Sequence, residues 1–184
     1  MIIVSDKVGK IIIRKIEKDC GLADVEYKPV ELVLANANDA EKIWEMQKIA
    51  FAELFAKYKD KDTSPATETL EKVQSRFDEA NTYHYFIQVG GDTVGALRIV
   101  DKKTDEFKRV SQIFVMPEYR RKGYALSAIT IAESIHGENK WEAETILNER
   151  ALCMFYTRMG YRINKEKSFN RVNDKMTLIT FVKY

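Results

Sequence analysis

A short basic turn between two apolar segments is the part of the chain best suited to chemistry. Residues 120–122 are three consecutive cations and precede Gly123, and the β-rich run before them ends at Pro117, which has no amide hydrogen to extend a strand ladder. The first amides of a helix lack intrahelical acceptors, and the helix dipole adds about half a positive charge there. Glycine leaves that backbone open to a phosphate. The segment Val110–Ala132 therefore predicts an anion site where a strand leads into a helix.

The same segment resembles the coenzyme A-binding motif of the GNAT superfamily, Arg/Gln-x-x-Gly-x-Gly/Ala after a strand that ends in Val-x-Pro. The chain reads Arg120-Arg-Lys-Gly123-Tyr-Ala125 after Val115-Met-Pro117. One strand and one helix later, Phe-Tyr156-Thr-Arg-Met-Gly160-Tyr is similar to the family's Tyr-x-x-x-Gly-Phe element. Two hallmarks in the family's order make a chance match improbable.

Two further elements extend the resemblance to residues 30–184. Val94-Gly95 resembles the family's Val-Gly element in the third strand, and Trp141-Glu-Ala-Glu-Thr-Ile resembles a branch whose substrate is largely unassigned. The resemblance implies an N-acetyltransferase that uses acetyl-CoA as co-substrate and needs no metal. An acceptor amine would attack the thioester directly, without a covalent enzyme intermediate, and strand amides would polarise the carbonyl.

Roles for individual residues follow from the resemblance alone. Backbone groups of residues 113–115 would pair with the pantetheine arm in a gap between splayed strands, and the amides of residues 121–125 would hold the pyrophosphate. The implied coenzyme A contacts are Ile113, Phe114, Val115, Arg120, Arg121, Lys122, Gly123, Tyr124, Ala125 and Asn148. Asn148 lies eight residues before Tyr156, where the family often has an Asn at seven. It is either a pantetheine contact or the N-cap of the last helix.

Tyr156 is the implied catalytic residue. A phenol can protonate a departing thiolate because their pKa values, about 10 and about 8.5, are comparable. The alternative is that Tyr156 packs in the core beside Phe155. Cys153 is better interpreted as a small buried hydrophobe than as a nucleophile. The sequence does not distinguish the general base among Glu53, His84, Glu118, Glu142 and Glu144.

Composition narrows the remaining classes of function. The 30 Lys+Arg and 28 Asp+Glu of the 184 residues nearly balance, which is not the charge footprint of a nucleic-acid-binding protein. The two cysteines, Cys20 and Cys153, form neither a CxxC pair nor a disulfide framework, and no apolar run is long enough for a signal peptide or a membrane span. We expect a cytoplasmic protein without a nucleic-acid or membrane partner, and Asp60 and Asp62 complete no metal loop.

The elements that must position these residues alternate between β and α patterns. We expect strands at 30–34, 82–89, 93–100, 109–115, 141–146 and 176–183, and helices at about 40–58, 66–79, 124–136 and 149–159. This order predicts an α/β (α+β mixed) fold. The resemblance adds a twisted, mostly antiparallel sheet that splays between its fourth and fifth strands, with helices on both faces. Residues 1–29 are expected to be an N-terminal extension, a β-hairpin with its turn at residues 6–9, beside an acetyltransferase domain at 30–184.

Three functions remain open at this level. A non-catalytic acyl-CoA sensor of the same fold would carry the same motif, and a basic turn could bind nucleic acid in a salt-dependent way. The resemblance implies that the acceptor, a small-molecule or peptide amine, faces a variable segment at about residues 51–66, whose charges are mixed. Neither the acyl chain preference nor the formation of a homodimer can be predicted from these residues.

Overall fold

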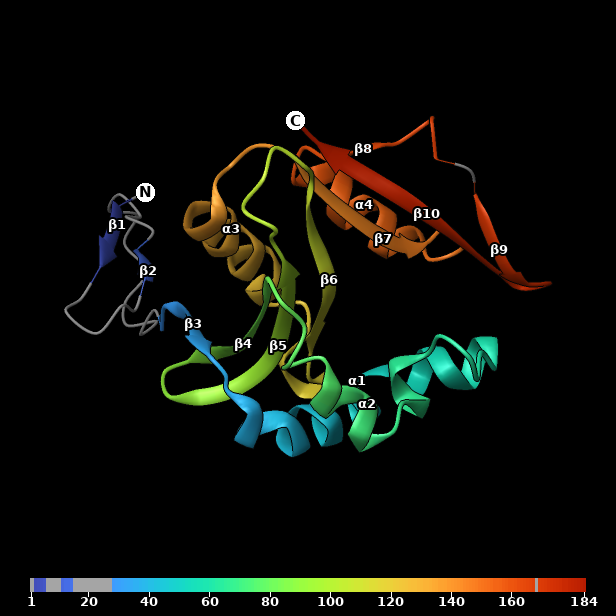
Figure 1. Ribbon diagram of the computed structural model, residues 1–184, viewed down its shortest axis with the longest axis horizontal. Helices are drawn as coiled ribbons and strands as arrows, with labels where there is room; N and C mark the ends of the chain where they lie inside the picture. Colours follow the sequence, from blue (N-terminus) through green and yellow to red (C-terminus); the bar gives the residue numbers. More distant parts are fainter. Residues whose placement is uncertain (1, 6–10, 15–27, 168) are drawn as a thin grey trace, which may run out of the picture.

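The described strands form one mixed sheet, and the helices pack on it. The computed structural model describes residues 2–5, 11–14, 28–167 and 169–184. Its strands lie in the order β1-β2-β3-β4-β5-β6-β7-β10-β8, and β9 pairs with β10 (Figure 1). Their bounds are β1 Ile2–Ser5, β2 Ile11–Arg14, β3 Val30–Leu34, β4 Thr82–Val89, β5 Asp92–Val100, β6 Lys108–Val115, β7 Trp141–Ile146, β8 Arg162–Ile163, β9 Asn170–Asn173 and β10 Met176–Lys183. All pairs are antiparallel except β6 with β7, which confirms the mixed, mostly antiparallel sheet.

The first two strands pair with each other and join the sheet at one point. Ile2 of β1 lies opposite Arg14 of β2, and Ile12 of β2 pairs with Glu31 of β3. The turn that we predict at residues 6–9 lies outside the described residues. The separation of residues 1–29 from the domain at 30–184 stays a prediction.

Two glycines form the turn of the central hairpin between β4 and β5. Gly90 and Gly91 both have positive φ angles, 60° and 90°, as a two-residue hairpin turn requires. Further along β5, Gly95 lies against β6 so closely that a Cβ built there would be 2.2 Å from the carbonyl oxygen of Phe114. The Val-Gly element is therefore needed for the approach of β5 and β6.

A capped 3₁₀ turn leads into helix α1, Ala40–Tyr58. Asn36 accepts a hydrogen bond from the Asn38 amide (3.0 Å), and Asp39 accepts one from the Asn36 amide (2.9 Å), around the 3₁₀ turn η1 at Ala37–Asp39. The buried face of α1 consists of Ala40, Ile43, Gln47, Ala50 and Tyr58. This agrees with the helix that we predict at about 40–58.

The second predicted helix is shorter than expected. Instead of one helix at 66–79, the chain forms a 3₁₀ turn η2 at Pro65–Thr67 and a six-residue helix α2 at Leu70–Ser75. Ser64 caps the first and Thr69 the second, so the two caps divide the segment. The short strands β8 and β9 were also not predicted, because two to four residues are too few to show a period.

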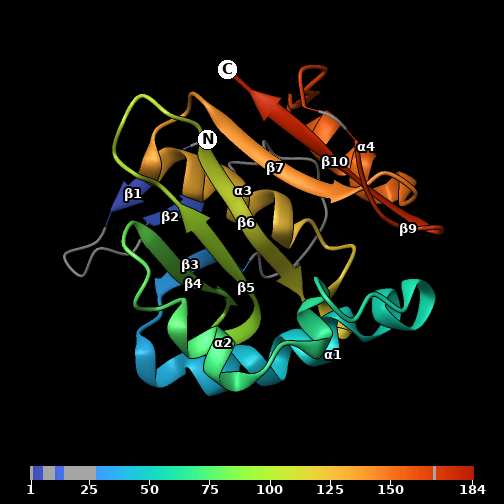
Figure 2. The ribbon, with the colours of Figure 1, turned by 45° about the vertical axis from the view of Figure 1, so that its right-hand side comes forward.

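Helices cover both faces of the sheet (Figures 1 and 2). Phe114 of β6 packs on Phe51 of α1 with ring centroids 5.8 Å apart, whereas Ile113 and Val115 pack with α3, Tyr124–His136, on the other face. Helix α4, Arg150–Arg158, lies on the α3 face through Tyr156 and its contact with Phe181 of β10. The strand β6 is thus held between α1 and α3.

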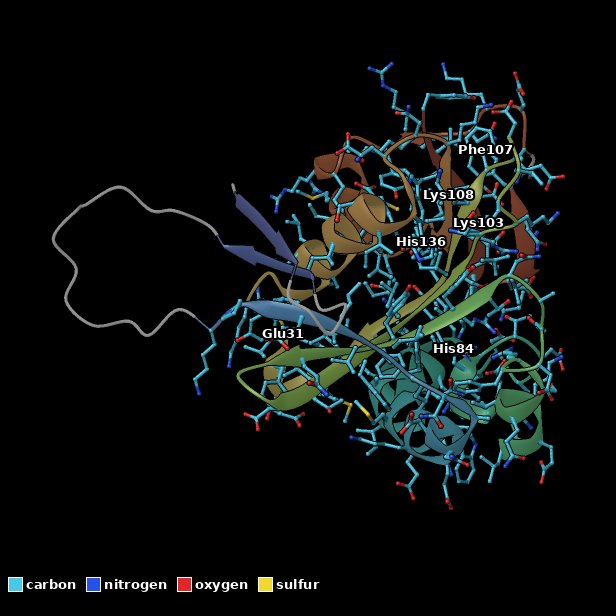
Figure 3. The ribbon with its side chains drawn as sticks, turned by 60° about the vertical axis from the view of Figure 1, so that its left-hand side comes forward. Glu31, His84, Lys103, Phe107, Lys108 and His136 are labelled. Carbon is cyan, nitrogen blue, oxygen red and sulfur yellow. The ribbon has the colours of Figure 1, made fainter. Side chains whose placement is uncertain are left out.

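The C-terminal end of α3 is fixed by a buried polar group. The ring of His136 has Nε2 3.0 Å from the Tyr85 hydroxyl and Nδ1 2.8 Å from Oδ2 of Asp101, which also binds Lys103. Figure 3 shows His136 and Lys103 together at this end of the helix. Burial alone would raise the pKa of the Asp101 carboxyl. The hydrogen bonds from Lys103 and His136 together have the larger effect, and they lower this pKa to about 2. Because α3 is anchored there, its opposite end has a defined position at the end of β6.

Candidate active site

The strands β6 and β7 diverge after a short parallel stretch. They pair only at Lys108–Trp141, Arg109–Glu142 and Val110–Ala143, although β6 continues to Val115 and β7 to Ile146. The pairing with β5 skips Ser111, since Arg98 pairs with Gln112 and Ile99 with Val110. A residue inserted in this way bends its strand. The bulge lies directly after the last parallel pair, so it accounts for the splay, which Figure 2 shows.

The wide end of this gap leads into the basic turn. After Val115 the chain makes a 3₁₀ turn, η3 at Pro117–Tyr119, and enters α3 at Tyr124. Arg121 and Gly123 have positive φ angles of 65° and 81° on either side of Lys122. Gly123 is the N-cap residue, and a Cβ at this position would meet no atom within 4 Å. The backbone is therefore uncrowded at Gly123, beside Arg121 and Lys122, which are both exposed, and the first amides of a helix have no acceptor within the helix.

Arg120, the first residue of the motif, makes contacts that we had not predicted. Its guanidinium donates to the carbonyl oxygens of Val115 (3.1 Å) and Ala50 (2.5 Å) and lies 3.3 Å from Oε2 of Glu53. These contacts join the end of β6 to α1. The side chain of Arg120 holds two elements together in this structure, and its part in binding coenzyme A stays a prediction.

The other predicted cofactor residues lie along the gap and the turn. Ile113, Phe114 and Val115 belong to the part of β6 beyond its pairing with β7, and Tyr124 and Ala125 form the first turn of α3. The ammonium of Lys122 lies 5.6 Å from the centroid of the Tyr119 ring. The fold thus brings the predicted residues 113–115 and 121–125 to one strand-to-helix junction.

Tyr156 lies level with the narrow end of the gap, on the α3 face of the sheet. Its ring stacks on Phe181 with centroids 5.7 Å apart, and Phe181 pairs with Ala143, the last residue of β7 in the parallel stretch. The side chain is buried, and burial raises the pKa of its hydroxyl. In the part of the chain that the structure describes, this hydroxyl makes no hydrogen bond. Both interpretations from the sequence agree with this position, since Tyr156 packs in the core and keeps a free proton donor.

Glu149 lies seven residues before Tyr156, and Asn148 lies eight before it. The side chain of Asn148 accepts a hydrogen bond from the Thr177 amide of β10 (3.2 Å). The N-cap position of α4 belongs to Glu149, whose carboxylate accepts from the Tyr58 hydroxyl (2.6 Å) and Lys57 (2.5 Å) of α1. The N-cap alternative for Asn148 is therefore wrong, because α4 begins one residue later. Its contact with pantetheine stays a prediction.

The five candidates for the general base occupy different places. His84 is buried against Phe77 and the Arg76 carbonyl, at the C-terminal end of α2, and Figure 3 shows it away from α3. Glu118 lies in the turn η3, and Glu53 pairs with Arg120. Of the five, Glu142 and Glu144 are the two that project from β7 beside the splay.

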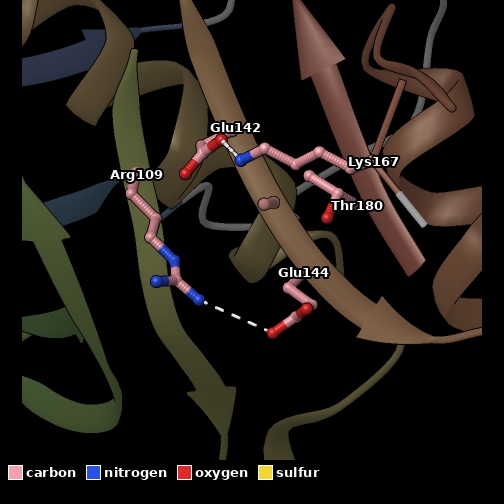
Figure 4. A pocket seen from close by; sticks show the side chains of 6 residues that line it. Arg109, Glu142, Glu144, Lys167 and Thr180 are labelled. Carbon is pink, nitrogen blue, oxygen red and sulfur yellow. Dashed lines mark hydrogen bonds and ion pairs between the residues drawn. The ribbon is translucent and has the colours of Figure 1, made fainter. Parts of the chain in front are cut away.

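A cavity of about 250 Å³ opens beside these two carboxylates. It is lined by Arg109, Glu142, Ala143, Glu144, Lys167 and Thr180 (Figure 4). Lys167 lies 2.5 Å from Glu142, and Arg109 reaches across from β6 to within 3.6 Å of Glu144. No motif in the sequence singles out Arg109, on β6, or Lys167, in the loop between β8 and β9, because the fold brings each from a distant segment to one of the two carboxylates.

Comparison with known proteins identifies the family to which this geometry belongs. Residues 52–178 match the family model described as an acetyltransferase (GNAT) domain. The chain belongs to the GNAT acetyltransferase family. The match confirms the resemblance and the assignment as an acyltransferase. A sequence comparison with curated proteins finds no match.

Solved structures share the GNAT fold at low sequence identity. An acetyltransferase from Thermus thermophilus is 16% identical with a TM-score of 0.63, over 84% of this chain and 96% of that one. The microcin C7 self immunity acetyltransferase MccE, solved with acetyl-CoA and AMP, is 11% identical with a TM-score of 0.63, over 84% and 91%. The PaiA N-acetyltransferase of Thermoplasma acidophilum, solved with coenzyme A, is 12% identical with a TM-score of 0.60, over 84% and 99%.

Two searches of the described residues bear on other classes of site in this GNAT chain. Among residues 2–5, 11–14, 28–167 and 169–184, no three His, Cys, Asp or Glu side chains are grouped so that they could hold a metal ion. No helix within the same ranges combines the length and apolar character needed to cross a bilayer.

Proposed function

We propose that this GNAT domain transfers an acetyl group from acetyl-CoA to the amine of a small molecule or peptide by direct attack. The observation that carries the proposal is the junction of the splayed strands with the open turn at Gly123. A strand gap and a cluster of free amides at its wide end suit a ligand with an extended arm and a pyrophosphate. The MccE and PaiA structures, solved with acetyl-CoA and with coenzyme A, support this choice of donor.

The junction fits this ligand in size and charge. Gly123 leaves its surroundings open, and Arg121 and Lys122 flank it with exposed cations. From Val115 back to Val110, the strand β6 extends for about 16 Å at the usual rise of about 3.3 Å per residue. A pantetheine arm that enters at the turn would run along this length, pairing with backbone groups of residues 113–115. Its thioester would then lie near the last parallel pair, Val110–Ala143.

The chemistry at that point consists mainly of positioning. The amine nitrogen attacks the thioester carbonyl carbon, and the free amides of β6 stabilise the oxygen as it gains charge. The C–S bond then breaks, and the electron pair leaves with the sulfur. We assign the proton that the thiolate takes up to the hydroxyl of Tyr156, because a tyrosine hydroxyl is protonated at neutral pH and this one makes no hydrogen bond among the described residues.

A turnover assay tests the proposal. Purified full-length chain is incubated with acetyl-CoA and a panel of amines, amino acids and N-terminal peptides, and released thiol is measured together with the mass of the acetylated product. The proposal predicts thiol release that depends on the amine, with one acetyl group gained per thiol. Tight binding of acetyl-CoA without turnover on any amine would instead assign the chain to the acyl-CoA sensors. We expect the reaction to take place in the cytoplasm, in keeping with the cysteine usage.

A further inference from the structure

The ion pair between Arg109 and Glu144 is incomplete. Arg109 Nη2 and Glu144 Oε2 are 3.6 Å apart, beyond hydrogen-bond distance, and the two side chains are 47% and 33% exposed. Among the described residues, neither side chain makes a hydrogen bond. A guanidinium has five N–H donors and a carboxylate has two acceptor oxygens. Both groups therefore retain most of their capacity for a ligand.

The pair lies where the two strands begin to separate. Arg109 belongs to the parallel stretch of β6, and Glu144 is the first residue of β7 beyond it. Figure 4 shows the two side chains reaching toward each other across the opening between the strands. Tyr156 lies at the same level on the α3 face, since it stacks on Phe181, the partner of Ala143. Tyr156 and Glu144 thus lie level with the narrow end of the gap, on opposite faces of the sheet.

The rest of the cavity lining favours a small acceptor that carries a positive and a negative charge. Glu142 is already paired with Lys167 at 2.5 Å, which leaves Arg109 and Glu144 as the open cation and anion. The four charged groups of the lining cancel, so the cavity favours neither a polycation nor a polyanion. Its volume of about 250 Å³ is below the range of about 300–1,000 Å³ typical of sites for drug-sized ligands. A small zwitterion, or the charged end of a longer molecule, fits these limits.

We propose that the acceptor carries an anionic group, a carboxylate or its like, next to the amine that is acetylated. The amine binds Glu144 and the anionic group binds Arg109, so that the acceptor enters between the two side chains. A guanidinium recognises a carboxylate through two parallel hydrogen bonds, which fixes the orientation of the amine toward the gap. This inference rests on the proposed acetyl transfer and names the class of its acceptor: amino acids and similar zwitterions.

Glu144 acts as the general base in the acetyl transfer. The acceptor enters as an ammonium ion and loses one proton to water to become the attacking amine. The nitrogen forms the C–N bond to the acetyl carbonyl carbon, and Glu144 takes the second proton. The C–S bond breaks, and the thiolate takes the proton of Tyr156, which is restored from Glu144 through solvent. The products are the N-acetyl acceptor, the free thiol of coenzyme A and one proton.

A pair of matched acceptors tests this class. We compare kcat/KM for L-alanine and L-alaninamide. Each value is calculated per unprotonated amine, because the amino group of alaninamide is less basic than that of alanine. The comparison is extended to β-alanine and ethylamine. The expected ratio of acid to amide is at least about tenfold, which corresponds to about 1.4 kcal/mol. In Arg109→Gln the ratio should fall toward one. Arg171→Gln is the matched control, because Arg171 pairs with Asp174 on β9, away from the cavity, and should keep the ratio.

Each outcome bears on one claim. Three results would each overturn the zwitterion proposal and leave acetyl transfer intact. They are equal kcat/KM for the acid and the amide, turnover confined to amines without an anionic group, and an unchanged acid-to-amide ratio in Arg109→Gln. Absence of amine-dependent thiol release on the whole panel would contradict acetyl transfer itself. For Glu144 as base, Glu144→Gln should lower kcat on alanine by about 100-fold without weakening coenzyme A binding measured by calorimetry. An unchanged kcat would remove Glu144 from the reaction.

Discussion

Arg120 donates a hydrogen bond to the backbone carbonyl of Ala50, 2.5 Å away on α1, although its neighbours in the motif face solvent. The same guanidinium binds the carbonyl of Val115 at the end of β6. The arginine that begins the motif thus fixes the position of α1 over the widening gap, while Arg121 and Lys122 remain available to a phosphate.

Replacing these two arginines should separate a structural contribution from a binding one. Arg120→Ala leaves the carbonyls of Ala50 and Val115 without a charged donor, so we expect the free energy of unfolding in urea to fall by about 1–3 kcal/mol. Arg121→Ala removes only an exposed cation. It should change stability by less than about 0.5 kcal/mol and weaken coenzyme A binding about fivefold, the size of an exposed ion pair. The reverse pattern would show that Arg120 is the phosphate contact.

Tyr156→Phe should impair turnover without unfolding the protein. Its hydroxyl makes no hydrogen bond in the described part of the chain, so removing it costs little stability, whereas loss of a general acid lowers kcat by about 100-fold or more. The matched control is Tyr161→Phe, whose hydroxyl donates to the buried Glu133 at 2.9 Å. That change should cost about 1–3 kcal/mol of stability and leave kcat nearly unchanged. A Tyr156→Phe enzyme with full kcat would reduce Tyr156 to a packing residue.

Gly95 should tolerate no side chain. Alanine there would place its Cβ 2.2 Å from the Phe114 carbonyl oxygen, and this backbone atom cannot move without breaking the pairing of β5 with β6. We expect Gly95→Ala to lower the free energy of unfolding by about 3 kcal/mol. Gly91→Ala, in open space at a φ of +90°, should cost only the backbone strain of about 1 kcal/mol. Equal losses in the two variants would show that the close approach carries no stability.

Acid should destabilise the protein partly through His84. Burial, opposed by the hydrogen bond to Arg76 and aided by the charges of Arg98 and Arg76, lowers the pKa of His84 from its ordinary 6.5 to about 4. Between these values the unfolded chain binds more protons than the folded one, so stability falls as the pH drops through this window. From pH 7 to pH 5 this amounts to about 2 kcal/mol. His84→Gln should lose correspondingly less stability in urea titrations at the two pH values, and an equal loss would contradict the shift.

The sequence was sufficient for features that depend on local patterns. The strands at 82–89 and 93–100 and the helix at 124–136 follow from local patterns of residue types, and the structure has all three. The helix expected at 66–79 failed because capping by Thr69 competes with helix continuation from Pro65. Two hydroxyls that can each cap a helix leave its first residue undetermined without tertiary contacts.

The site could be predicted only in its continuous part. The turn at residues 120–123 lies in one segment, and its backbone geometry follows from strand, proline, glycine and helix in order. The bulge at Ser111 and the pairing of Arg109 with Glu144 depend on the registers of β6 with β5 and with β7. Register joins distant residues by backbone hydrogen bonds, which leave no mark on the types of the two side chains.

The most direct test of the central claim, a coenzyme A site at the Gly123 turn, is a calorimetric titration of coenzyme A into three forms of the chain. Gly123 and Gly91 both have positive φ angles and open surroundings, so glutamate causes the same kind of backbone strain at each. Gly123→Glu alone would place a carboxylate beside the pyrophosphate. We predict wild-type affinity for Gly91→Glu and at least a 100-fold loss for Gly123→Glu, about 2.8 kcal/mol, with both variants folded by circular dichroism. Unchanged affinity in a folded Gly123→Glu would contradict the site.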